Sequence, residues 1–187
     1  MNKNELILTT ALRLFVENGF HGTATSKIAL ESGVATGTLF NYYPSKELLI
    51  ISLYNVINKK FDNYLTESLE SYSVSKESFR SLFSATVLWY LDNRLEYRYL
   101  QQFNNSPYYN SVVTNNLILE EHPLYVLLQN GINLVLLKPM PVDLLFSLFN
   151  AQINGLYEFI ILQDKKQEEW PKLIDDIFEL LWKMIKD

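Results

Sequence analysis

The apolar and polar positions of the chain follow the spacing of α-helices almost throughout. Apolar residues recur three and four positions apart in most segments, and no long stretch has the two-residue period of a strand. Residues 2–18 form the first such stripe, with Leu12 and Phe15 on one face, and Gly19 ends it. Prolines and a serine-rich break at 71–75 mark boundaries between further predicted helices. These helices cover residues 45–69, 76–92, 94–104, 109–121, 124–137, 142–163 and 168–186.

Residues 25–48 contain two short helices separated by a sharp turn. Thr25 can cap the first helix and Thr36 the second. Gly33 lies where the backbone must reverse, and Pro44 ends the second helix. Two helices joined by a short glycine-containing turn form a helix-turn-helix, whose second helix enters the major groove of DNA. The sequence therefore predicts an all-α DNA-binding protein.

Three runs in this region, ILTTALRLFVENGF, TATSKIALESGV and TGTLFNYYPSKELL, keep one register over three helices. Together, residues 7–49 resemble the N-terminal domain of the tetracycline-repressor (TetR) family of bacterial transcriptional repressors. Residues 96–107 are similar to a segment of some family ligand-binding domains. The resemblance implies a three-helix DNA-binding domain at 1–48 and a helical ligand-binding and dimerisation domain at 49–187, with about nine helices in all.

The resemblance also implies which residues contact DNA. The two threonines that begin the short helices, Tyr42 and Lys46 match phosphate contacts of the family, and Ser26 stands where family members can reach a base edge. An exposed asparagine at position 41 suits bidentate readout of adenine. The predicted DNA-binding residues are Thr25, Ser26, Lys27, Thr36, Gly37, Thr38, Asn41, Tyr42 and Lys46.

The charge balance is unusual for a DNA-binding protein, because the formal net charge is −5. DNA binding must therefore depend on a few well-placed cations and hydroxyls. Lys27 fits a solvated surface charge as well as a DNA contact, and Phe40, where the family usually has tyrosine, has no hydroxyl for a phosphate. A helix-turn-helix-shaped ligand-binding or interaction protein that does not bind DNA remains the alternative. Residues 1–50 are neutral, since Lys3, Arg13, Lys27 and Lys46 are matched by Glu5, Glu17, Glu31 and Glu47.

The chain is rich in aromatic residues, with 3 Trp, 12 Tyr and 11 Phe. Several lie in the segments that surround the ligand cavity in the family, although plain core packing is the competing interpretation of each. Arginines and lysines of the middle segments are scattered, which favours a hydrophobic effector over a sugar, nucleotide or phosphate. The candidate ligand residues are Trp89, Tyr90, Tyr97, Phe103, Tyr125, Phe149, Asn154 and Tyr157.

Residues 142–162 are apolar around almost the whole helix, so this helix must be buried on all sides. Asp143, Asn150, Gln152, Asn154 and Glu158 interrupt this stretch and argue against a membrane span. A two-fold dimer interface with the last helix is the prediction, and a purely intramolecular core is the alternative. The predicted interface residues are Ser147, Ala151, Gly155, Ile174, Phe178 and Leu181.

Enzyme chemistry has little support. The chain has no cysteine, its two histidines lie a hundred residues apart, and it has no GxGxxG, phosphate-loop or GxSxG motif. We therefore expect no catalytic residue, no metal and no cofactor. The combined expectation is a cytoplasmic homodimeric repressor that binds a palindromic operator and is released by a small hydrophobic molecule through the helix at 45–69. Repression and activation are not distinguished by the sequence.

Overall fold

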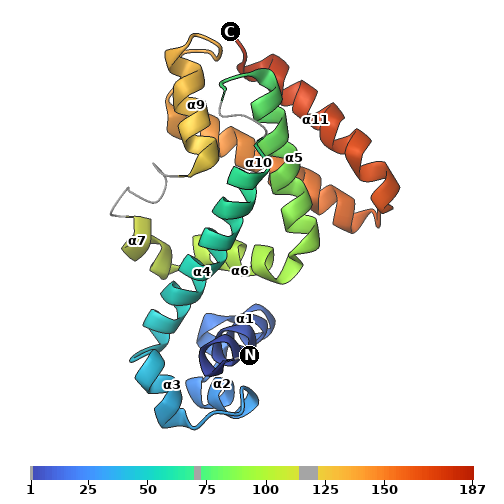
Figure 1. Cartoon of the computed structure of the whole chain (residues 1–187). Helices are drawn as coiled ribbons and strands as arrows, with labels where there is room; N and C mark the ends of the chain where they lie inside the picture. Colours follow the sequence, from blue (N-terminus) through green and yellow to red (C-terminus); the bar gives the residue numbers. More distant parts are fainter. Residues whose placement is uncertain (1, 70–72, 114–121) are drawn as a thin grey trace. The chain divides into compact units, whose positions relative to one another are not determined.

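The computed structural model describes residues 2–69, 73–113 and 122–187, which contain ten α-helices, one 3-10 helix and no strand (Figure 1). The all-α prediction is confirmed. Most of the helix predicted at 109–121 and the first two residues of the break predicted at 71–75 lie outside the described residues. The helices of the first half are α1 (Lys3–Gly22), α2 (Thr25–Glu31), α3 (Thr36–Tyr42), α4 (Lys46–Glu67), α5 (Lys76–Asp92), α6 (Arg94–Asn104) and α7 (Pro107–Val113).

Packing divides the chain into two compact units that interleave along the sequence. Unit 1 is Met1–Lys60 with Asn93–Asn115, and unit 2 is Phe61–Asp92 with Asn116–Asp187. This division differs from the single boundary at residue 48 predicted from the sequence. The reason is that α6 packs against α1 and so joins the N-terminal helices.

The first helix of unit 1 begins with reciprocal hydrogen bonds. Asn2 accepts from the backbone N–H of Glu5, whose carboxylate accepts from the Asn2 N–H. Regular helix ends at Gly19, whose φ of 74° is a left-handed value that glycine adopts without strain. The buried hydroxyl of Thr23 then donates to the carbonyls of Leu14 and Gly19 and fixes the turn into α2.

The helix-turn-helix is formed by α2 and α3, but the predicted capping is wrong. The extended residues that precede the two helices are Ala24 and Ala35, so Thr25 and Thr36 are the first helical residues and make no capping bond. Gly33 has the predicted left-handed backbone, with φ of 69°. Because neither threonine is used as a cap, their hydroxyls are available to an external partner.

Tyr99 of α6 connects α6 to α4 inside unit 1. Its ring contacts Phe20 edge-on at 5.5 Å, and its hydroxyl donates to the carbonyl of Ile50 at 2.7 Å. Burial raises the pKa of this phenol, so it remains protonated and a donor. Nearby, Phe103 stacks on Tyr54 at 4.0 Å. These rings explain why α6 belongs to the N-terminal unit.

Tyr99→Phe is expected to lower the free energy of unfolding by about 1 kcal/mol, because a buried hydrogen bond is lost while the ring contacts stay. For a chain of this size, that corresponds to a fall of roughly 2–4 °C in Tm, which calorimetry can measure. Tyr64→Phe on the exposed side of α4 is the control and should change Tm little. Equal Tm values for Tyr99→Phe and wild type would contradict the role given to this hydroxyl.

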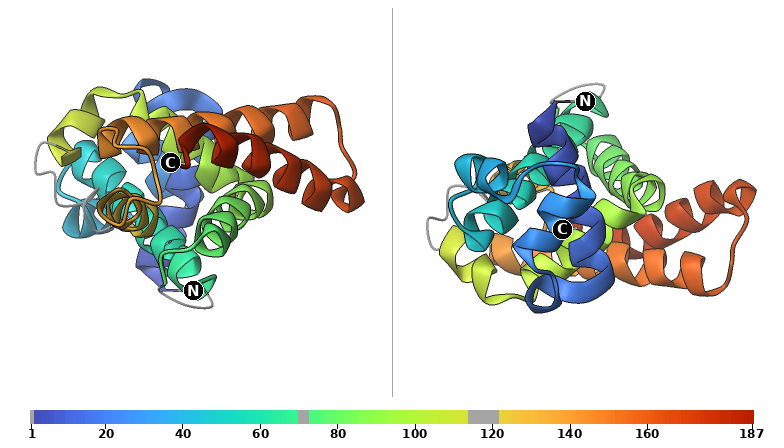
Figure 2. Two further views of the ribbon diagram at one scale, coloured as in Figure 1. Left: turned by 90° about the horizontal axis from the view of Figure 1, so that it is seen from above. Right: turned by 90° about the horizontal axis from the view of Figure 1, so that it is seen from below.

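Unit 2 contains α5, α9 (Pro123–Asn133), α10 (Val142–Leu162), the 3-10 helix η1 (Gln167–Glu169), α11 (Trp170–Ile185) and the last part of α4. Helix α10 packs against α5, α9 and α11. Figure 2 shows α10 and α11 side by side. Close packing requires Gly131 of α9, since a Cβ there would lie 2.8 Å from Leu137 Cδ1 and 3.0 Å from Phe79 Cζ. The central rings of this unit are Phe79, Phe83, Phe149, Phe178 and Trp182.

Among the described residues, α10 is the one helix long and apolar enough to cross a membrane by length and composition. Its inner face is the buried core of unit 2, with Leu145, Phe149 and Ile153 fully covered. Its outer face includes exposed Asp143 and Glu158. A buried apolar face opposite an exposed face with charged residues is typical of a helix that packs on a protein core.

Candidate nucleic-acid interface and ligand site

The outer side of α3 and the start of α1 form one shallow depression of about 380 Å³. It is lined by Thr38, Asn41 and Tyr42 of α3 and by Lys3 of α1. The hydroxyl of Tyr43 donates to Asn4 Oδ1 at 2.5 Å, which holds the beginning of α1 against the end of α3. Lys3 was not predicted from the sequence, because residues as far apart in the chain as Asn4 and Tyr43, 39 positions, give no local signal of their proximity.

All nine residues predicted to contact DNA are at least partly exposed. Eight of them lie on α2 and α3, with Tyr42 the last residue of α3, and Lys46 begins α4. Ser45 caps α4 by accepting from the backbone N–H of Leu48, so the position of Lys46 is set by a defined helix start. Phe40 is also exposed, at 41%, and has no hydrogen-bonding group. The local geometry thus gathers the predicted hydroxyl, amide and ammonium groups near one helix.

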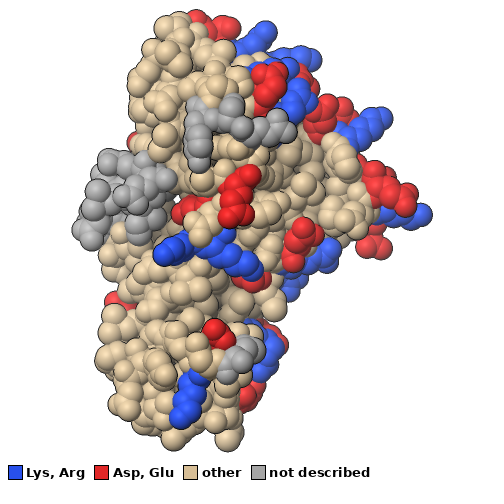
Figure 3. Space-filling view, viewed as in Figure 1, with Lys and Arg blue, Asp and Glu red and all other residues tan. Residues whose placement is uncertain are grey.

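The cations of this surface differ in how they are paired. Lys27 lies 3.9 Å from Glu31, and Arg13 contacts both Glu31 and Glu17, so the positive charges of Lys27 and Arg13 are largely neutralised by nearby carboxylates. Within the described residues, Lys3 and Lys46 have no ion-pair partner. Partial burial lowers the pKa of Lys46. Figure 3 shows a mostly uncharged surface over α3, which makes these two ammonium groups the main local source of positive potential.

The eight candidate ligand residues are divided between the two units. Tyr97 and Phe103 are buried in unit 1, whereas the other six lie in unit 2. Phe149 is fully buried in contact with Phe79 and Phe83, so it is a core residue. Asn154 is half-buried on α10.

The remaining four candidates, Trp89, Tyr90, Tyr125 and Tyr157, belong to a connected group of rings in unit 2. Phe61 contacts Trp89 at 4.8 Å and Tyr90 at 5.5 Å, and Tyr90 contacts Tyr157 at 6.4 Å. Phe61 and Phe146 were not among the residues predicted from the sequence, and the ring of His122 contacts both of them and so connects Tyr125 to the rest of the group. We call this group the aromatic cluster, which consists of Phe61, Trp89, Tyr90, Tyr125, Phe146 and Tyr157.

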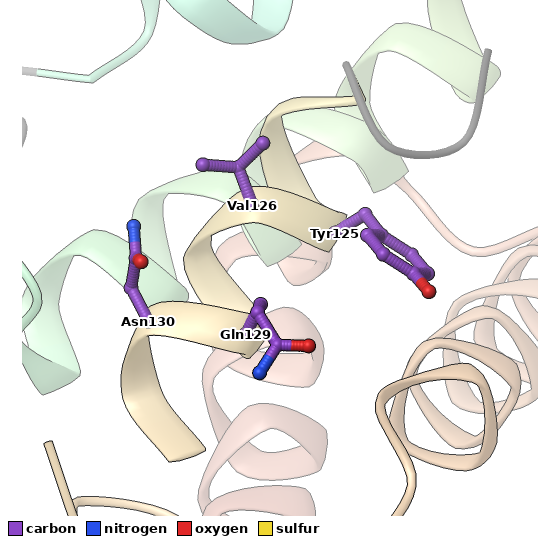
Figure 4. A pocket seen from close by; sticks show the side chains of 4 residues that line it. All are labelled: Tyr125, Val126, Gln129 and Asn130. Atoms are coloured by element: carbon purple, nitrogen blue, oxygen red, sulfur yellow. The ribbon is translucent and has the colours of Figure 1, made fainter. Parts of the chain in front are cut away.

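A second depression, of about 310 Å³, lies on the surface of α9. Its four lining side chains, Tyr125, Val126, Gln129 and Asn130, all come from this helix (Figure 4). The Tyr125 hydroxyl donates to Asp143 Oδ1 of α10 at 2.9 Å. Tyr125 therefore lines this surface depression and also makes a T-shaped ring contact with Phe146 of the aromatic cluster, at 5.8 Å.

The candidate dimer residues fall into two groups. Ser147, Ala151 and Gly155 are exposed on α10, with nothing in the protomer within 4 Å of a Cβ at Gly155. Ile174, Phe178 and Leu181 are buried in the core of unit 2, so they cannot form the outer face predicted for them. The apolar residues on the outer side of α11 are instead Leu173, Ile177, Leu180 and Met184.

Residues 7–53 match the family model described as bacterial regulatory proteins, tetR family. A curated relative, the fatty acid metabolism regulator protein of Bacillus subtilis, is 33% identical over 78 residues, which are 42% of this chain. That match spans 40% of the relative's own length. The uncharacterised regulator YuxN of the same bacterium is 31% identical over 96 residues, 51% of this chain and 32% of its own.

Solved structures are similar over the whole chain. A putative tetR family transcription regulator from Shewanella sp. PV-4 has a TM-score of 0.88 and 29% identity, with 100% of both chains covered. The regulator FadR of Bacillus subtilis, solved in complex with stearoyl-CoA, has a TM-score of 0.77 and covers 95% of this chain and 96% of its own. At 24% identity, the FadR comparison concerns the fold.

Proposed function

Because the chain belongs to the tetR family of bacterial regulatory proteins, we propose that it is a DNA-binding transcriptional regulator, acting as a ligand-released repressor. The observation that carries this proposal is the exposed face of α3, where Thr38, Asn41 and Tyr42 stand beside Lys3. Its similar proteins are named as regulators rather than enzymes.

DNA recognition in this proposal separates into positioning and readout. Lys3 and Lys46 neutralise phosphates, and exposed hydroxyls such as that of Thr36 donate to phosphate oxygens. Asn41 reads a base edge in the major groove. Since residues 1–50 are neutral overall, few counterions are released on binding and non-specific affinity is low. A protein of this kind finds its operator by fitted contacts rather than by a strong positive field.

Pairing of two copies supplies the second half-site of a palindromic operator. On α10, the exposed apolar and small residues follow three- and four-residue spacing, and they are Leu144, Ser147, Ala151, Gly155, Phe159 and Leu162. The outer side of α11 adds a second apolar stripe with the same spacing, in which Leu180 is 61% exposed. Two such helices from each copy would cover these apolar stripes in a four-helix contact.

The effector in this proposal is a largely apolar molecule bound in unit 2 at the aromatic cluster. The names of the similar regulators, one of fatty acid metabolism and one in complex with stearoyl-CoA, support an acyl chain as its apolar part. Helix α4 contributes Lys46 to unit 1 and its residues from Phe61 onward to unit 2. A ligand that binds one arrangement of α4 better than another shifts the DNA-binding equilibrium by its difference in affinity.

Lys46→Ala and Lys3→Ala are each expected to weaken operator and random DNA about equally and to reduce the slope of log K against log salt by about 1, because one phosphate contact is lost. Fluorescence anisotropy at several salt concentrations measures both quantities. Lys172→Ala, an exposed lysine on α11, is the matched control.

Asn41→Ala provides the contrast, since it should relax discrimination at one base position by about 1–3 kcal/mol and leave the salt slope unchanged. An affinity that does not depend on salt in the wild-type protein would contradict DNA binding altogether. That result would favour the alternative of an interaction protein with a helix-turn-helix shape.

A further inference from the structure

One polar pair lies next to the aromatic cluster inside unit 2. Asp62 belongs to the last turns of α4, and His122 precedes α9. Asp62 Oδ1 is buried without a hydrogen-bond partner among the described residues, and the nearest basic atom is His122 Nε2, at 3.7 Å. That separation is longer than a direct hydrogen bond, so the two groups face each other without satisfying each other.

The protonation of His122 follows from its second contact. Its Nδ1 accepts from the backbone N–H of Leu124 at 3.2 Å and so caps α9. An acceptor nitrogen carries no proton, and the neutral ring must hold its proton on Nε2, the atom that faces Asp62. Burial lowers the pKa of His122 to about 4, which keeps the ring neutral at physiological pH. The site therefore presents one N–H donor beside one carboxylate acceptor.

The surroundings of this pair are apolar. The His122 ring lies edge-on to Phe146 at 5.2 Å and 6.0 Å from Phe61, both members of the aromatic cluster. Burial raises the pKa of Asp62 to about 6, so at neutral pH a carboxylate is held there in its less favoured charged state. A buried polar atom without a partner is costly, and a bound donor would relieve that cost.

We propose that Asp62 and His122 bind the polar group of the effector and that this group is a neutral hydroxyl or primary amide on an apolar body. A hydroxyl oxygen placed off the line between the two atoms can lie about 2.8 Å from both, because they are 3.7 Å apart. It would donate to Asp62 Oδ1 and accept from His122 Nε2–H. This assignment rests on the proposed ligand-released regulator and defines the chemistry of its effector.

Other end groups fit the pair less well. A carboxylate or phosphate would place a second negative charge beside Asp62 in an apolar site. An ammonium group can donate to Asp62 but has no lone pair for His122 Nε2–H. The hydrogen-bonding pattern therefore selects a group that both donates and accepts.

The assignment is tested with four probes of one chain length, 1-decanol, decanamide, decanoate and decylamine, below their micellar concentrations at pH 7.5. Binding to the full chain is measured by titration calorimetry and by the rise in unfolding temperature. We expect decanol and decanamide to bind at least roughly tenfold more tightly than decanoate and decylamine, because each charged probe leaves one buried group of the pair without a hydrogen bond.

Asp62→Asn is the diagnostic variant, since the asparagine amide donates where the carboxylate repels. Decanoate should bind this variant about tenfold more tightly than it binds wild type, while decanol binding falls. A purely structural role for Asp62 would weaken all four probes together. Asp92→Asn, an exposed change at the end of α5, should keep the wild-type order of probes. His122→Asn tests the second contact without removing a side chain that can cap α9.

Equal binding of the four probes, no binding of any, or a preference of wild type for decanoate or decylamine would overturn the assignment. Operator affinity is measured on the same samples. Salt-dependent operator binding without the expected end-group preference would remove this inference and leave the proposed function standing. Absence of operator binding with the end-group preference intact would instead contradict the proposed function and leave this inference standing.

Discussion

Gly155→Leu is expected to leave the protomer folded but to abolish its pairing and, with it, high-affinity operator binding. A Cβ at Gly155 meets nothing within 4 Å in the protomer, so a larger side chain projects outward without internal strain. In the proposed dimer the same surface lies where a helix of the second copy approaches α10. A leucine there would push the two helices apart and expose the apolar residues on both.

Sedimentation velocity at micromolar concentration reports the assembly state of Gly155→Leu, and far-UV circular dichroism reports its helix content. Gly131→Leu is the matched control, because its side chain would collide with Leu137 and Phe79 inside unit 2. That variant should lose at least about 1–3 kcal/mol of stability by overpacking rather than lose pairing selectively. A wild-type monomer, or an unchanged dimer in Gly155→Leu, would end the argument for this interface.

Between neutral and acid pH, Asp62 and His122 are expected to make opposing contributions to the free energy of unfolding. The folded-state pKa of His122, about 4, lies below its ordinary value of 6.5, so its stabilising contribution is present above pH 6.5 and falls as the pH drops toward 4. The folded-state pKa of Asp62, about 6, lies above its ordinary value of 3.8, so its contribution is present below pH 3.8 and is lost as the pH rises through 6.

Between pH 4 and 6 the two contributions have opposite slopes and largely cancel. Each is on the order of 2–3 kcal/mol at most, and that of Asp62 is reduced by solvent because its side chain is 32% exposed. Single variants separate them. Relative to wild type, Asp62→Asn should lose stability on acidification from pH 6 to 4, and His122→Asn should gain it.

Urea titrations at half-unit steps of pH give the free energy of unfolding needed for this comparison. The Asp92→Asn control should follow the wild-type profile. Parallel profiles for Asp62→Asn and His122→Asn would show that these two groups do not titrate as their burial implies.

The helix-turn-helix could be predicted from sequence because its determinants are local. A left-handed Gly33 and a proline at position 44 act on their own neighbours, and both have the expected effect. The caps were misassigned by one residue, since the extended backbone that precedes each helix falls on Ala24 and Ala35. Threonine is a favourable cap, but residue preference does not fix the start of a helix to a single position.

The faces of the last helix could not be assigned from the same pattern. Both Ile174–Phe178–Leu181 and Ile177–Leu180–Met184 follow helical spacing, and only the fold shows that the first set is buried and the second is outside. Periodicity identifies an apolar face without stating whether the partner is the same chain or a second copy. In α11 both of these sets are apolar.

The Asp62–His122 pair could not be predicted from the sequence, for a different reason. The two residues are sixty positions apart, Asp62 is one of several acidic residues on a helix, and His122 is a single histidine before a proline. Their chemistry arises from a 3.7 Å approach and shared burial, which tertiary structure alone creates. The same is true of Lys3, whose role depends on its position beside α3.

The interleaving of the two units bears on how genes for such proteins can recombine. Because Tyr99 and Phe103 come from α6, a fragment ending at Lys60 would lack rings that cover Phe20, Ile50 and Tyr54. A single crossover between two related genes anywhere in α4 would join α1–α3 of one parent to α6 of another and mismatch that contact. Exchange of operator specificity therefore requires either a double crossover that transfers both segments together or changes confined to the outer face of α3.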